Sequence, residues 1–165
     1  MRRIQVMGFV LLLLATTTAL IKAQGRSPLL DRVVRSIKRE EPRWRFIPGV
    51  CTCPPLVSGQ RSYAAGGWYL EEAGERRHVS IYVSYVPSAQ LAAEWMESMS
   101  RWPVAEGWRG EKYSLGDEAY LSRNQDGTNS TVSFRKGKIV VEVSGELGDV
   151  VRFAGYAEKE VPAAI

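Results

Sequence analysis

The sequence predicts an α+β domain: an antiparallel sheet of about five to six strands with helices packed on one face, preceded by an amphipathic helix. Two kinds of pattern support this class. Several short segments alternate apolar and polar residues and are separated by tight turns, which is typical of antiparallel strands. Other segments repeat apolar residues every three to four positions, which is typical of helices that pack on a sheet.

Length and composition exclude several classes of protein. The 165 residues suffice for one domain of ordinary size, and a hydrophobic content of 45% excludes a fully disordered chain. One histidine excludes a multi-histidine metal site, and two cysteines exclude a four-cysteine zinc site. The formal net charge of +4 is the unusual global feature, because a basic chain suggests an anionic partner such as nucleic acid.

The first 23 residues have the order of a secretory signal peptide. Residues 1–3 are a positive start, residues 6–21 are nearly free of charge, and the small Ala23 stands where a signal peptidase would cut. We therefore expect an exported protein, periplasmic or secreted, whose mature chain begins at Gln24. The alternative is a retained membrane anchor, although the dense apolar part is short for a span of about 20 residues.

Export would change the charge balance. The leader holds three basic residues and no acid, so 19 basic and 18 acidic residues remain in the mature chain. Residues 24–50 keep a net charge of +4, whereas residues 51–165 have a net charge of −3. The basic excess therefore belongs to the N-terminal segment, and we expect no nucleic-acid partner.

Residues 24–50 are expected to form a basic helical arm and a linker. Ser27 and Pro28 favour a helix start, because a hydroxyl caps the first turn and proline fits the first helical position. Apolar residues follow at helical spacing: Leu30, Val33, Val34 and Ile37. Basic residues lie largely off this stripe: Arg32, Arg35, Lys38 and Arg39. Such a helix either packs on the protein's own sheet or contacts an anionic membrane or a partner through its basic face.

After the helix, which Pro42 ends, residues 43–60 are expected to be irregular. Pro48-Gly49 and Pro54-Pro55 break any regular element there. We interpret this segment as the linker that leads into the α+β domain of residues 51–165.

The first half of that domain is expected to hold two strands and a helix. The strands cover residues 61–70 and 77–85 and are joined by a turn at Ala73-Gly74. The second strand alternates cleanly, which predicts that one of its faces is buried. A helix over residues 89–100 follows, and Pro103 prevents its continuation.

The second half is expected to hold three short strands and a last helix, after an irregular stretch. The strands cover residues 118–123, 130–135 and 138–144. Lys136-Gly137 joins the last two as a hairpin loop, in which glycine can take the positive φ that such turns need. The helix covers residues 147–159 and buries its valines and alanines.

Part of this domain matches a recognisable order of elements. The strand at residues 78–85 is followed directly by Pro87-Ser88 and a helix, and the motif Leu115-Gly116-Asp117-Glu118-Ala119-Tyr120 precedes a hairpin and an alanine-rich terminal helix. From Arg77 to Ala157 the chain thus resembles small exported bacterial α+β domains and is similar to the extracellular sensor domains of some membrane Ser/Thr kinases. The resemblance implies a binding or sensing module and no enzyme. Those sensor domains carry disulfides within this unit, whereas both cysteines here precede it.

The sharpest local motif is Cys51-Thr52-Cys53. In an exported protein the two cysteines can form a disulfide, within the chain through a small and unusual ring or between chains. Two thiolates can instead bind a soft metal such as Cu(I), and inert thiols are the third alternative. A thiol-dependent metal carrier that uses Cys51 and Cys53 is therefore one candidate function.

No catalytic residue is assigned, and no cofactor is expected. His78 is the only histidine, and nothing around it resembles a nucleophile motif. A small secreted hydrolase would have to use Glu118 or His78 in a cleft. Asp117 and Glu118 do not readily pair, because adjacent strand residues point to opposite faces.

Two tryptophans are the candidates for a ligand-facing loop: Trp102 and Trp108 lie beside Pro103 and Gly107 in chain expected to be irregular. The leading functional hypothesis is an exported, non-catalytic envelope or extracellular module that binds a ligand or a protein partner. Its basic residues Arg32, Arg35, Lys38 and Arg39 would contact that partner or the surface of an anionic membrane.

Overall fold

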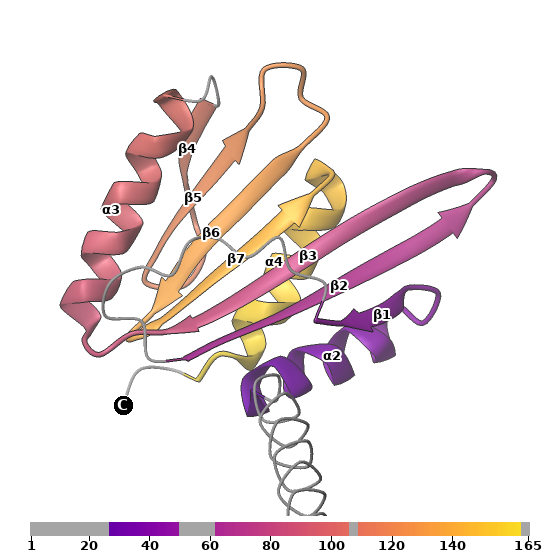
Figure 1. Ribbon diagram of the computed structural model, residues 1–165, viewed down its shortest axis with the longest axis horizontal. Coiled ribbons are helices and arrows are strands. Elements are labelled where there is room, and N and C mark those ends of the chain that lie inside the picture. Colours follow the sequence, from indigo (N-terminus) through magenta and orange to yellow (C-terminus); the bar gives the residue numbers. More distant parts are fainter. Residues whose placement is uncertain (1–26, 50–61, 106–108, 163–165) are drawn as a thin grey trace, which may run out of the picture.

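The computed structural model describes residues 27–49, 62–105 and 109–162, which form a seven-stranded antiparallel sheet and three helices (Figure 1). The strands are β1 (Arg45–Pro48), β2 (Ser62–Glu72), β3 (Glu75–Tyr85), β4 (Arg109–Tyr113), β5 (Glu118–Arg123), β6 (Ser130–Lys136) and β7 (Ile139–Gly145). The helices are α2 (Pro28–Glu40), α3 (Ala89–Ala105) and α4 (Leu147–Glu160). The strand order across the sheet is β1-β2-β3-β7-β6-β5-β4. The predicted α+β class and antiparallel sheet are confirmed, with more strands than expected.

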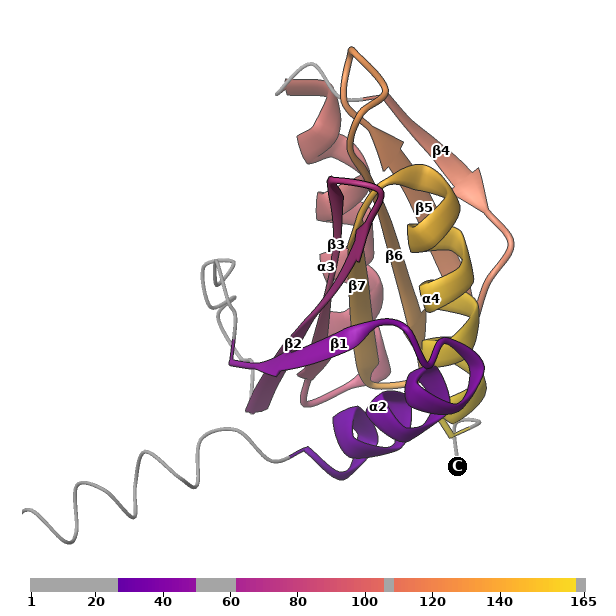
Figure 2. The ribbon, with the colours of Figure 1, turned by 90° about the vertical axis from the view of Figure 1, so that its right-hand side faces the viewer.

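Helices cover both faces of the sheet, whereas the sequence predicted helices on one face. α2 and α4 lie on one face, and α3 lies on the other (Figures 1 and 2). The continuous apolar run in β7 explains why both faces need cover, because successive strand residues point to opposite sides. Val141 and Val143 join the core under α2 and α4, and Val140 joins the smaller core under α3.

The N-terminal helix α2 packs on the protein itself. The Ser27 hydroxyl accepts a hydrogen bond from the Leu30 backbone N–H at 3.4 Å, as the predicted cap requires. Leu29, Leu30, Val33 and Ile37 are buried in the core that also contains α4 and the sheet. Of the two alternatives for the apolar stripe, packing within the chain is the one observed.

Aromatic rings join this N-terminal segment to the rest of the molecule. The Trp44 ring, in the turn between α2 and β1, meets the Phe153 ring of α4 edge-on, with ring centroids 4.9 Å apart. Phe153 also meets Trp68 of β2, with ring centroids 5.9 Å apart. Trp68 in turn lies against Phe46 of β1 at a centroid distance of 4.9 Å. Such pairs add to the stability that burial alone provides.

Two strands form where irregular chain was predicted. β1 forms because Phe46 lies opposite Trp68 and packs against it, and Pro48 is tolerated because β1 is an edge strand. β4 forms the other edge by pairing with β5. The pairing of β1 with β2 links segments that are distant in sequence, and β4 lies in a segment flanked by glycine and proline. In both cases the contacts between strands override the local preference of the chain.

Two further expectations were wrong in detail. α3 continues to Ala105 through Pro103, which lies in its last turn, where a proline removes a single backbone hydrogen bond. β3 is buried on both faces between Val79 and Ser84. It was expected to be buried on one face, but it lies between β2 and β7 and has apolar residues on one side and buried hydroxyls on the other.

The packing of α2 predicts that this helix is required for stability. Ile37→Ala should lower the free energy of unfolding by about 2–5 kcal/mol, because it leaves a cavity in a fully buried site. Arg35→Ala, on the exposed face of the same helix, should change it by no more than about 0.5 kcal/mol. Urea unfolding followed by tryptophan fluorescence measures both. Equal, small effects of the two substitutions would show that α2 does not belong to the cooperative core.

Candidate functional site

The structure places some of the predicted site residues and leaves others out. Cys51, Cys53 and Trp108 lie outside the described residues. Trp102 belongs to the last turns of α3 and not to an irregular loop, and the position of its side chain is not described. The ligand, disulfide and metal hypotheses that rest on these residues therefore stay predictions.

The carboxylates of the Asp117-Glu118 motif hold the sheet together. Glu118 Oε2 accepts a hydrogen bond from Arg135 Nε at 2.9 Å, and Tyr120 donates its hydroxyl to Glu118 Oε1 at 3.1 Å. Asp117 Oδ2 accepts from the Gly137 backbone N–H at 2.7 Å, which ties the start of β5 to the β6–β7 hairpin. The motif thus has a clear structural role.

The only histidine lies far from these carboxylates. His78 is an exposed residue of β3, and β7 and β6 lie between that strand and β5, which carries Glu118. Partial burial and the neighbouring charge of Arg76 lower the pKa of His78. The geometry does not bring His78 and Glu118 into one site, so it gives no support to the hydrolase alternative.

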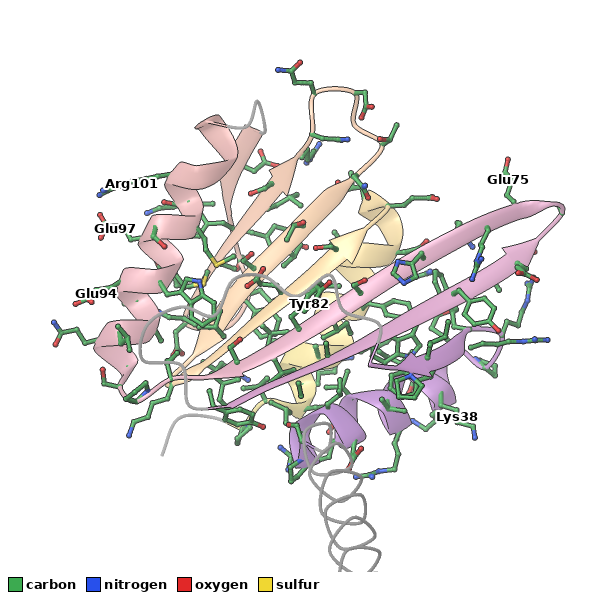
Figure 3. All side chains as sticks on the ribbon, in the orientation of Figure 1. Lys38, Glu75, Tyr82, Glu94, Glu97 and Arg101 are labelled. Carbon is green, nitrogen blue, oxygen red and sulfur yellow. The ribbon has the colours of Figure 1, made fainter. Side chains whose placement is uncertain are left out.

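The sheet face on the side of α3 carries a buried layer of hydroxyl groups, which we call the hydroxyl layer. Its members are Ser80, Tyr82 and Ser84 of β3, Ser133 of β6 and Ser122 of β5. Glu142 of β7 lies at its centre. It is paired in register with Tyr82 of β3 on one side (Figure 3) and with Ser133 of β6 on the other. A partly exposed carboxyl-bearing residue thus has hydroxyl-bearing neighbours on both adjacent strands.

This environment changes the acidity of Glu142. The residue keeps some solvent exposure, but protein atoms surround its carboxyl closely, and this burial raises its pKa to about 7. A carboxyl with a pKa near neutrality changes its charge close to physiological pH, which is a property of many functional sites. Sequence reasoning missed Glu142. The available signal was one acid inside the otherwise apolar run Ile139-Val140-Val141 to Val143.

The predicted basic residues of α2 separate into two groups. Arg32 is used within the fold, since its guanidinium donates to the Glu160 backbone carbonyl at 3.0 Å. Arg35, Lys38 and Arg39 are exposed. Lys38 points away from the sheet (Figure 3), and Arg39 pairs with its exposed neighbour Glu40 at 2.9 Å. The exposed residues recur at i, i+3 and i+4, so they share one side of the helix.

Comparison with protein-family models, with curated proteins and with solved structures finds no match to this chain. Among the described helices, none is long and apolar enough to cross a membrane. The geometry of the chain is therefore the basis for proposing what it does.

The acidity of Glu142 predicts a stability that depends on pH. Because its folded-state pKa of about 7 lies above the reference value of 4.5, the folded protein binds more protons than the unfolded chain between these values. The contribution of Glu142 to stability should therefore fall as pH rises from 4.5 to 7, by at most about 3 kcal/mol. Glu142→Gln should remove this loss and make the protein more stable than the parent at pH 8.

Urea unfolding of the parent and of Glu142→Gln across this pH range measures the effect. The exposed Glu146→Gln serves as the matched control and should keep the parent's slope. An unchanged slope in Glu142→Gln would mean that the carboxyl of Glu142 titrates as it would in water.

Proposed function

We propose that this chain is an exported, non-catalytic module that binds an anionic surface through the outer side of α2, which we call the α2 basic face (Arg35, Lys38 and Arg39). One observation carries the proposal: the apolar stripe of α2 is buried in the core while these cations remain exposed. The helix is therefore fixed in place and presents its charge outward. The resemblance to exported sensor domains also supports a binding role.

The partner we propose is a membrane that contains anionic phospholipid. Because the apolar stripe is already buried, α2 cannot insert into the bilayer as an amphipathic helix would. Binding would then be electrostatic, at about 1 kcal/mol for each Lys or Arg near the surface. Three such residues correspond to a partition coefficient higher by a factor on the order of 100.

Vesicle sedimentation tests this proposal with the chain from Gln24 to Ile165. The protein should bind vesicles that contain phosphatidylglycerol and not vesicles of phosphatidylcholine alone, and added salt should release it. Replacing Arg35, Lys38 and Arg39 by alanine should weaken binding by a factor on the order of 100. These substitutions leave the buried side of the helix unchanged, whereas a chain that begins at residue 50 would lack the core residues of α2.

A matched triple variant provides the control. Arg101, Lys112 and Arg123 are exposed cations on α3, β4 and β5, so replacing them by alanine removes the same charge from other surfaces. Equal weakening by both triple variants would show that only net charge matters. Equal binding to both kinds of vesicle would also contradict the proposal.

A further inference from the structure

A groove of about 400 Å³ lies beside the edge of β2, and we call it the β2-edge groove. Its lining residues are Pro42, Arg43, Arg45, Tyr69, Leu70 and Glu71. The groove lies where the edge strand β1 is shorter than its neighbour β2: pairing with β1 ends at Arg45 opposite Tyr69, whereas β2 continues to Glu72 (Figure 1). Its volume lies in the range of small-molecule sites.

Tyr69 and Arg45 line this groove, and the guanidinium of Arg76 lies beside the Tyr69 ring. Tyr69 is half-buried and lies directly across from Arg45 in the antiparallel pair. Arg76 of β3 places its guanidinium carbon 5.2 Å from the centroid of the Tyr69 ring. Guanidinium groups and tyrosine rings both bind flat ligands by stacking.

The charges around the groove are incompletely neutralised. Arg43 pairs with Glu72 at 2.6 Å. Within the described part of the chain, neither Arg45 nor Arg76 has an ion-pair partner, although Glu71, the one acid of the lining, stands opposite Arg76 in register. The groove thus keeps the exposed guanidinium of Arg45, with that of Arg76 nearby over the Tyr69 ring, and these groups can bind an anion.

A neighbouring hollow differs from this groove in how its arginines are paired. This second hollow, of about 310 Å³, lies on the other side of the Pro42-Arg43 turn. Its arginines are neutralised by buried or partly buried acids: Arg77 pairs with Asp149, and Arg152 pairs with Asp149 and Glu41. That network holds α4 against β3 and the end of α2, so it is explained by the fold, whereas Arg45 and Arg76 are not.

We propose that the β2-edge groove binds a small ligand that joins a planar ring to a carboxylate or phosphate group. Arg45 would bind the oxyanion, because a guanidinium matches two oxygens of such a group. The ring of the ligand would lie against Tyr69. This site is separate from the α2 basic face, and it does not depend on membrane binding.

Isothermal titration calorimetry with four probes tests the site: phenyl phosphate, benzoate, inorganic phosphate and benzyl alcohol. Phenyl phosphate and benzoate should bind saturably, and the tighter of the two identifies the preferred anion. Inorganic phosphate and benzyl alcohol should each bind at least about tenfold more weakly, because each lacks one of the two groups that the site contacts.

Substitutions assign the contacts. Arg45→Gln should weaken the binding of phenyl phosphate about tenfold or more. Tyr69→Leu should weaken the binding of phenyl phosphate and leave the binding of inorganic phosphate unchanged. If Tyr69→Leu folds poorly, Arg76→Gln provides a second test, because Arg76 is exposed and lies beside the Tyr69 ring. Arg101→Gln, an exposed arginine of α3, is the matched control and should have no effect.

Two outcomes would overturn the proposal. One is the absence of saturable binding of both phenyl phosphate and benzoate to the parent protein. The other is equal weakening by Arg45→Gln and Arg101→Gln, which would indicate a response to net charge alone. The triple alanine variant of the α2 basic face should bind phenyl phosphate like the parent, so failure of the membrane proposal and failure of this one are distinguishable.

Discussion

The contact of Trp44 with Phe153 is the interaction on which the rest of the architecture depends. Trp44 lies in the chain between α2 and β1, so its burial against α4 fixes both elements at once. Arg77 stacks over the same Trp44 ring at 5.6 Å and pairs with the buried Asp149 at the start of α4. An unpaired buried carboxylate would be strongly destabilising. The aromatic contact and the ion pair therefore support each other, and together they hold the N-terminal segment in one position.

This arrangement decides which basic residues remain at the surface. Several cations have structural roles: Arg32 and Lys136 donate to carbonyl groups at the C-terminal end of α4, and Arg135 holds Glu118. Cations at the C-terminus of a helix also interact favourably with its dipole. Among the described residues, Arg35 and Lys38 of α2's outer side and Arg45 beside Tyr69 have no ion-pair partner, and Arg39 pairs only with its exposed neighbour Glu40. Charge without a structural partner is the feature that points to binding, and net charge alone would not have revealed it.

Local signals in the sequence predicted the elements that depend on local chemistry. The Ser27 cap and the apolar stripe predicted α2, and Gly137, with φ of 55°, forms the hairpin turn where a glycine was expected. Of the two strands that were missed, β4 pairs with the strand that follows it, whereas β1 depends on a partner distant in the chain. β1 exists because Phe46 can pack on Trp68, and no pattern within four residues announces that contact.

The candidate sites were harder to predict for the same reason. Arg45 and Tyr69 line the β2-edge groove and Arg76 lies beside the Tyr69 ring, and only the register of three strands brings these residues together. The side of α2 that faces solvent could be predicted from periodicity, and three of the four predicted cations do lie there. Arg32 was the exception, because its partner is a backbone carbonyl at the far end of the chain.

The two faces of the sheet also differ in how firmly they hold what covers them. α2 and α4 share the large apolar core with most of the strands, whereas α3 packs on a small core over β4, β5, β6 and β7. Elements with fewer buried apolar contacts open at lower free energy. The α2 basic face belongs to the firmly held side, whereas Tyr69, between Trp68 and Leu70 of the large core, points to the other side of the sheet. A charge change at Glu142 acts on the sheet face opposite α2, so the fold separates the residue that responds to pH from the α2 basic face.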